Sequence, residues 1–318
     1  MISRQPWLDL EVPGERITTR HYHILTTAQD QRVVAELPAF LEASLERHRL
    51  FAGTNLGQPA LPSPPGRMQL FLFANREQWA RFTRATIDAS AHPLLAIEVG
   101  GYAAGGRAVM FALPPAFDRL TLKIAAHEGW HQYVQRSFRE PLPTWADELI
   151  AVMAEGFLVD ATGNYRFEPL LNPERLDQLQ SVLEMGRWQP LETILAGDPT
   201  DLLGTEPSRA VDYYAQLWAL GLYLAVEQSR WLGVQRLLRD AARGRLNREV
   251  GGAGDDLGER AFRRYVSTDI RRIDEGYLAF ARALVDEASA ANASGSMPRY
   301  GSVPSTILRT AGPATLEP

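Results

Sequence analysis

Two histidines four residues apart, His127 and His131, are the residues of this chain whose types and spacing point most clearly to chemistry. In a helix, side chains at positions i and i+4 lie on one face, so two imidazoles can converge on one metal ion. Glu128 follows His127 and completes the pattern HExxH, in which a carboxylate beside the metal can take a proton from water. The motif therefore predicts a metal-dependent hydrolytic site.

A helix must position this pair, and the sequence predicts one from Asp118 to Phe138, with Asp118 as its N-cap. Its apolar stripe runs through the histidine pair: Leu120, Ile124, His127 and His131. A polar side chain on a buried stripe needs a hydrogen bond or a metal, because an unsatisfied buried polar group costs about 2 kcal/mol. The alternative is a pair of core histidines that hydrogen-bond internally and bind no metal.

A second helix is expected to supply the third ligand. Residues 141–143 (PLP) break the first helix, and Thr144 with an acidic residue three positions later is typical of a capped start of the helix TWADELIAVMAEGF. In the resulting helix hairpin Glu148 comes level with His131, which leaves a fourth coordination position for water, as in a catalytic zinc site.

Asp147 and Glu155 are the alternative third ligands. Glu155 lies two turns after Glu148 on the same face of the predicted helix, where it is better placed to orient a ligating histidine than to bind the metal itself. For Glu148 and Glu155 the simpler interpretation is a solvated helix face.

These motifs resemble those of a known family. HEGWH, followed after a short loop by PTWADELIAVMAEG, is similar to the gluzincin branch of the zincin metallopeptidases, and most similar to bacterial members of the peptidase MA-like group. The likeness extends from about Ile17 to Leu284. The family's usual Gly after the ligand Glu is Leu149 here, and the GAMEN signature of exopeptidases is absent.

The resemblance implies one Zn²⁺ held by His127, His131 and Glu148, with Glu128 as the general base that acts on peptide bonds. It also implies that Tyr214 donates a hydrogen bond to the oxyanion, with Tyr213 as the alternative donor. The simpler interpretation of Tyr214 is a core anchor, because it shares one stripe of a predicted helix with Leu217, Trp218 and Gly221. The expected activity is that of a zinc endopeptidase with a peptide or protein substrate. The alternative is a catalytically inactive zincin-like module that binds a peptide or protein.

The fold expected from the resemblance is an α+β, zincin-like metallopeptidase fold with a small mixed sheet, an HExxH helix and a mainly helical C-terminal half. We expect an N-terminal α/β subdomain over residues 1–138, a helical subdomain carrying the third ligand over residues 139–288, and a poorly ordered tail over residues 289–318.

Local patterns predict the N-terminal elements. A strand is expected from Ile17 to Thr27, a helix over residues 28–50, a strand from Met68 to Phe73 and a helix capped by Asn75. The glycine-rich stretch from Gly100 to Ala112 predicts a turn leading into a strand, either as an edge that pairs with extended substrate or as a plain hairpin. His21 and His23, in the first strand, are expected to be solvated or cross-strand partners rather than ligands.

Composition limits the other classes of function. The 318-residue chain has 45% hydrophobic residues and a net charge of −5 with both signs interspersed, so we expect neither a nucleic-acid partner nor a membrane partner. It contains no cysteine, so a metal site must use His, Asp and Glu. The N-terminus shows no signal peptide, which predicts a cytoplasmic location if this is the native start. The sequence does not indicate an oligomeric state.

Overall fold

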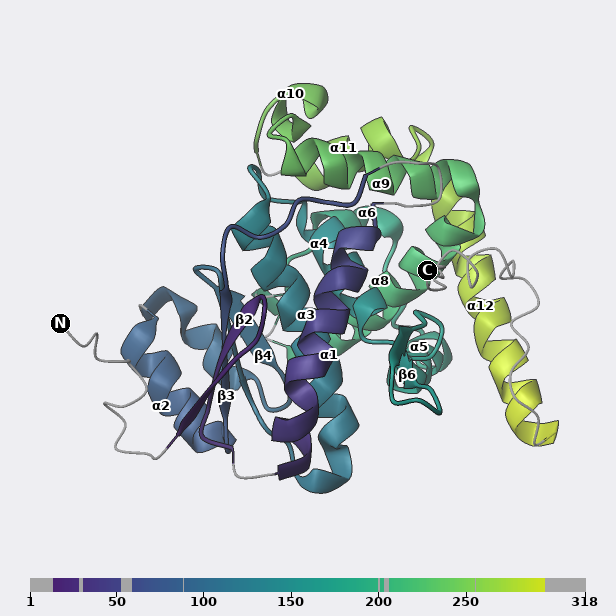
Figure 1. Ribbon diagram of the computed structural model, residues 1–318. Coiled ribbons are helices and arrows are strands. Elements are labelled where there is room, and N and C mark those ends of the chain that lie inside the picture. The colour runs from purple at the N-terminus through teal and green to yellow at the C-terminus, as the bar shows by residue number, and fades with distance from the viewer. Residues whose placement is uncertain are drawn as a thin grey trace, which may run out of the picture. The chain divides into compact units, whose positions relative to one another are not determined.

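The computed structural model describes residues 14–28, 31–52, 59–87, 89–199, 201–202, 206–254 and 256–294 (Figure 1). Contacts between Cα atoms divide the chain into two compact units. The N-terminal unit comprises Met1–Arg49, Pro62–Phe138 and Thr200–Pro207. The C-terminal unit comprises Leu50–Leu61, Arg139–Pro199 and Ser208–Pro318. The chain is therefore of the α+β class, with a mixed sheet in the first unit and mainly helices in the second.

The N-terminal unit is built on a five-stranded sheet with the order β1-β2-β3-β5-β4. Its strands are β1 (Glu15–Thr18), β2 (Tyr22–Thr26), β3 (Met68–Phe73), β4 (Gly101–Ala104) and β5 (Arg107–Phe111). The three central strands, β2, β3 and β5, run parallel, whereas β1 and β4 pair antiparallel at the two edges. The predicted strand at Met68–Phe73 is confirmed, and the glycine-rich stretch forms the β4–β5 hairpin with β4 as an edge strand.

The single strand predicted from Ile17 to Thr27 is wrong, because the chain reverses inside it and forms the β1–β2 hairpin. Glu42 holds the reversal: one carboxylate oxygen accepts hydrogen bonds from the Thr19 hydroxyl at 2.6 Å and from the backbone N–H of His21 at 2.8 Å. Its second oxygen lies 2.6 Å from Nδ1 of His21. His23 lies opposite Thr18 and hydrogen-bonds to its hydroxyl, so this histidine is a cross-strand partner.

Helices cover both faces of this sheet. They are α1 (Gln31–Leu50), α2 (Arg76–Thr86) and α3 (Asp118–Ser137), with short 3₁₀ helices η2 (Ala89–Ala96) and η3 (Pro115–Phe117). Figure 1 shows α2 to one side of the sheet and α1 to the other. The predicted cap of α2 is confirmed, since the Asn75 side chain accepts from the backbone N–H of Gln78 at 3.0 Å.

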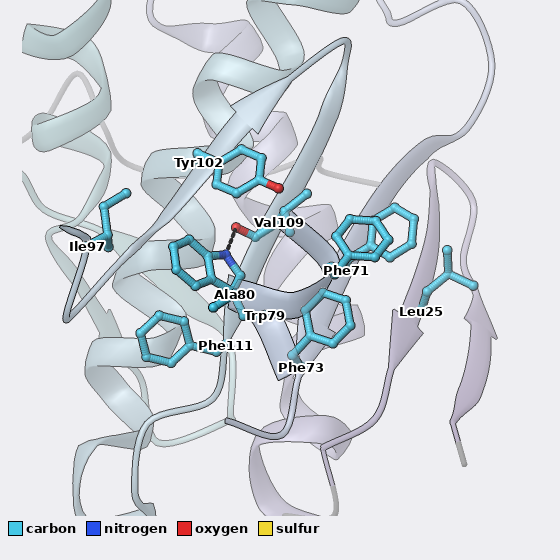
Figure 2. Packing of buried hydrophobic residues seen from close by; sticks show 10 residues of the cluster. Leu25, Phe71, Phe73, Trp79, Ala80, Ile97, Tyr102, Val109 and Phe111 are labelled. Atoms are coloured by element: carbon cyan, nitrogen blue, oxygen red, sulfur yellow. Dashed lines mark hydrogen bonds between the residues drawn. The ribbon is translucent and has the colours of Figure 1, made fainter. Parts of the chain in front are cut away.

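An aromatic cluster fills the space between α2 and the sheet (Figure 2). Alternate residues of the parallel strands β3 and β5 point into it, as the two-residue period of a strand requires: Phe71, Phe73, Val109 and Phe111. From α2, Trp79 packs against them and donates its indole N–H to the backbone carbonyl of Val109 at 3.2 Å. Ala108 and Met110, which alternate with Val109 and Phe111 in β5, are buried on the opposite side of the strand, and α3 contacts β5.

The C-terminal unit is mainly helical, as predicted, with one small hairpin of β6 (Phe157–Val159) and β7 (Tyr165–Phe167). Its helices are α4 (Thr144–Ala154), α5 (Pro173–Glu184), α6 (Leu191–Ala196), α8 (Pro207–Val226), α9 (Gln228–Ala242), α10 (Leu246–Val250), α11 (Leu257–Tyr265) and α12 (Ile270–Ser294). Because α12 continues to Ser294, the tail expected from residue 289 does not begin there, and residues 295–318 lie outside the described part of the chain. None of the described helices is both long enough and apolar enough to cross a bilayer.

Candidate metal centre

Helix α3 carries the HExxH motif and begins at Asp118, which corrects the expected cap. The N-cap position is Phe117, and no side chain caps this end of the helix. Asp118 instead lies in the first turn, where a carboxylate complements the helix dipole, and its Oδ2 atom is 3.8 Å from Nε of Arg32. The helix is 20 residues long, and most of its first 17 residues are buried.

Two contacts within the N-terminal unit fix the rotation of α3. On the sheet side, the side-chain amide of Gln132 donates to the backbone carbonyls of Gln69 at 2.5 Å and of Gly106 at 3.0 Å. On the α1 side, the buried ring of His48 lies edge-on to Trp130, with ring centroids 5.6 Å apart. This ring lies close to Gly129, in the middle of the motif, where an added Cβ atom would make an ordinary 3.5 Å contact with Cε1 of His48.

His127 and His131 converge as the spacing predicts. Their Nε2 atoms are 3.2 Å apart, and the ring centroids are 4.9 Å apart at an interplanar angle of 70°. His127 is buried and His131 is half-buried. Two imidazoles that aim the same nitrogen at one point are arranged either to share a proton or to bind one ion.

Glu148 joins the two histidines. One ligand atom from each of His127, His131 and Glu148 lies within 4.8 Å of the others, and among the described residues this is the one group of three such side chains that could hold a metal ion. Thr144 does not cap α4 as expected; it is the first helical residue, after Pro143 at the N-cap. Pro143 fixes an extended entry and its carbonyl accepts from Asp147 N–H at 3.0 Å, so Glu148 still falls in the second turn.

Neither alternative acidic residue belongs to this group. Glu155 is the C-cap of α4, and its two oxygens accept hydrogen bonds from the Arg175 guanidinium at 2.7 and 2.9 Å and from the Asn172 amide at 2.8 Å. Burial alone would lower the pKa of Arg175, but the Glu155 carboxylate outweighs burial and raises this pKa. Glu155 therefore forms an ion pair with Arg175, and its expected role in orienting a histidine stays a prediction.

Glu128, the predicted base, is buried beside the edge strand of the sheet. A Cβ atom at Gly101 of β4 would lie 3.1 Å from Cγ of Glu128, and 2.9 Å from both Cβ of Met110 and the carbonyl oxygen of Val109. The glycine therefore lets the strand approach the carboxylate-bearing side chain closely. The pKa of Tyr102, also in β4, is raised by burial and further by the Glu128 carboxylate, which places this negative charge near the strand.

The two candidate tyrosines, Tyr213 and Tyr214, make different contacts. The Tyr213 hydroxyl donates to the backbone carbonyl of Gly197 at 3.3 Å, and its pKa is raised by burial and then by the charges of Glu148 and Asp198. Tyr214 is half-buried, and the Arg175 guanidinium lies over its ring, 5.2 Å from the centroid. Tyr214 and Glu148 are both among the groups that raise the pKa of Arg175. Arg175 thus links the side chain of Tyr214 to the acidic residues of α4.

Leu149, at the position where the resembled family has Gly, is fully buried in the C-terminal unit. A glycine on a second helix makes room for it: a Cβ atom at Gly221 of α8 would lie 3.2 Å from Cδ2 of Leu149 and 2.6 Å from Sδ of Met153. The larger side chain is therefore accommodated within the packing of α4 against α8.

Comparison of the chain with protein-family models and with curated proteins finds no match. The sequence indicated the three residues of this group and Glu128 as the candidate base, but it did not indicate His48, Gly101 or Arg175. Of these, only Gly101 had a local signal, because a glycine pair at the start of an apolar strand is typical of close backbone approach.

Proposed function

We propose that this protein is a zinc-dependent peptidase of the gluzincin type, with a zincin-like fold and a peptide or protein as substrate. The observation that carries the proposal is the group of His127, His131 and Glu148, whose ligand atoms lie within 4.8 Å of one another. Two imidazole nitrogens and one carboxylate oxygen are the protein ligands of many catalytic zinc sites, in which the fourth position is left for water or substrate.

A zinc ion held by these three side chains would act as a Lewis acid and lower the pKa of water toward about 7. The other steps belong to the chain's own residues. Glu128, one residue after His127, takes the proton of the attacking water and then passes it to the leaving amine. In this scheme Tyr214 donates a hydrogen bond to the oxyanion of the peptide carbonyl. Tyr213 is less suited, because its hydroxyl already donates to Gly197.

Metal analysis and peptide cleavage by the same preparation test the proposal. Purified protein, prepared without chelator, should contain zinc at about one equivalent and should cleave members of an unbiased peptide library. Glu128→Gln removes the base but none of the three ligands, so it should retain zinc while cleavage falls by about 10²-fold to 10⁴-fold. Undiminished cleavage by Glu128→Gln contradicts the assigned base.

Two other outcomes identify the alternatives. Stoichiometric metal with no cleavage of any peptide favours a zincin-like binding module. Protein that takes up no metal even when zinc is added favours two core histidines that share a proton, and the 3.2 Å separation of the two Nε2 atoms is compatible with that arrangement.

A further inference from the structure

An arginine-rich concavity in the C-terminal unit forms a second candidate site, separate from the metal group. It has a volume of about 600 Å³ and lies along α9 and the turn that follows it. Its lining includes Leu232, Arg236, Arg239, Asp240, Arg243 and Arg245. Small-molecule sites typically have volumes of about 300 to 1,000 Å³, so the concavity has the size of a ligand site.

Three of the lining arginines lie close together on α9, although their positive charges repel one another. Arg236, Arg239 and Arg243 are spaced i, i+3 and i+7, so they lie on one stripe of the helix and span about 10 Å along its axis. Burial lowers the pKa of Arg239, and the neighbouring charges of Arg243 and Arg236 add to this effect. Like charges at these spacings destabilise a helix, and a bound anion would remove that cost.

The one carboxylate lining the concavity is already engaged. The Asp240 side chain forms an ion pair with Arg245 through one oxygen and accepts from the Tyr265 hydroxyl at 2.9 Å through the other. The Arg239 guanidinium is also engaged, because it donates a hydrogen bond to the backbone carbonyl of Ala52. Arg236 and Arg243 are exposed and form no ion pair within the described part of the chain.

The helix dipole explains the positions of only some of these arginines. A cation at the C-terminal end of a helix is favourable, which explains Arg243 at the C-cap of α9. The effect falls off within one turn, and Arg236 lies two turns earlier. A protein with a net charge of −5 therefore concentrates positive charge around one concavity for a reason other than helix capping.

We propose that this concavity binds a small ligand that carries at least two phosphoryl groups. Guanidinium groups bind phosphate oxygens through two parallel hydrogen bonds, and three arginines spread over about 10 Å match a chain of phosphoryl groups better than a single one. Leu232, one turn before Arg236, offers an apolar contact for an organic part of the ligand.

Calorimetric titration of the full-length protein with inorganic triphosphate at low ionic strength tests this proposal. We expect one binding site, with affinity that rises from phosphate to diphosphate to triphosphate and falls as salt is added. Arg236→Ala and Arg243→Ala should each weaken triphosphate binding by about tenfold or more, and Arg236→Lys by less, since it keeps the charge but loses the paired hydrogen bonds.

Two control variants make the result specific. Arg271→Ala removes an exposed arginine that is paired with Glu275 on α12, and it should leave binding unchanged. His131→Ala should also leave binding unchanged, because the anion does not use the metal group; this variant separates the present proposal from the proposed peptidase activity. The proposal is overturned if triphosphate shows no single site, if phosphate binds as tightly as triphosphate, or if Arg271→Ala weakens binding as much as Arg236→Ala.

Discussion

Gly101 of the edge strand and Glu128 of the HExxH helix lie so close that a single added carbon on the glycine would come within 3.1 Å of Cγ of Glu128. The position of the proposed base is thus set by a residue that has no side chain. The same added carbon would lie 2.9 Å from the Val109 carbonyl oxygen, which belongs to the backbone and moves less readily than a side chain.

Gly101→Ala should therefore destabilise the protein by about 1 to 3 kcal/mol and displace Glu128. We expect peptide cleavage to fall more than metal content, since none of the three ligands is changed. Gly129→Ala is the matched control for stability: its added carbon makes an ordinary 3.5 Å contact with His48, and alanine favours a helix by up to about 1 kcal/mol. Urea denaturation of both variants checks this, and equal stability of the two contradicts the assigned contact.

The assignment of Glu148 rather than its neighbour is tested by metal affinity. Removing a residue that hydrogen-bonds to a metal ligand can weaken metal binding by roughly 100-fold. Removing one of the three protein ligands themselves should weaken zinc binding by more than that. Glu148→Ala should show this loss, whereas Asp147→Ala, one residue away in the same helix, should retain the metal. Competition with a chromogenic chelator measures both affinities, and a larger loss in Asp147→Ala reverses the assignment.

Because Leu149 packs against Gly221, we expect substitutions of these two residues to have coupled effects on stability. Leu149→Ala should cost about 2 to 5 kcal/mol because it leaves a cavity, and Gly221→Ala should cost about 1 to 3 kcal/mol because its methyl group meets Leu149 and Met153. In the double variant the new methyl group occupies part of the cavity. The free energy of unfolding should therefore fall by less than the sum of the two single changes, and strict additivity contradicts the contact.

His48 predicts loss of stability in acid. Burial, followed by the charge of Arg47, lowers the pKa of His48 from an ordinary value of 6.5 to about 3. Below pH 6.5 the unfolded chain therefore binds a proton that the folded chain does not, so the stability present above that pH is lost as the pH falls toward 3. For this group the loss is about 2 kcal/mol between pH 6.5 and pH 5.

Denaturation of wild type and His48→Gln, both with chelator, at pH 7.5 and at pH 5 measures this contribution. Glutamine keeps a polar partner for the Ser44 hydroxyl, which lies 3.2 Å from Nε2 of His48, but it does not titrate. The variant should lose less stability on acidification than wild type. Parallel losses in the two proteins would show that His48 takes up its proton in the folded state at an ordinary pH.

The sequence predicted this candidate site better than it predicted the ends of the elements that carry it. The i, i+4 spacing of His127 and His131 determines their convergence once the segment is helical, and Glu148 lies in the second turn of a helix whose start is fixed by proline. The predicted caps at Asp118 and Thr144 are wrong by one residue, because the chain enters both helices through a preceding non-helical residue without a side-chain cap.

Tertiary partners account for what local pattern could not show. The β1–β2 reversal depends on Glu42, more than 20 residues away in sequence, and the role of Glu155 depends on Arg175. No local periodicity encodes such pairs. The zincin-like fold, the metal and the peptidase chemistry remain predictions of the motif and its resemblance, for which the observed ligand geometry is the support.

The indole N–H of Trp145, three residues before Glu148, donates to the backbone carbonyl of Gly258 at 2.9 Å, and its ring packs edge-on against Phe262. Part of the surroundings of α4 is thus built from residues more than 100 positions later in the chain. During translation both histidines leave the ribosome well before that packing can form. A nascent or C-terminally truncated chain lacks this support for its third ligand, so the proposed hydrolytic centre matures only after synthesis has passed α11.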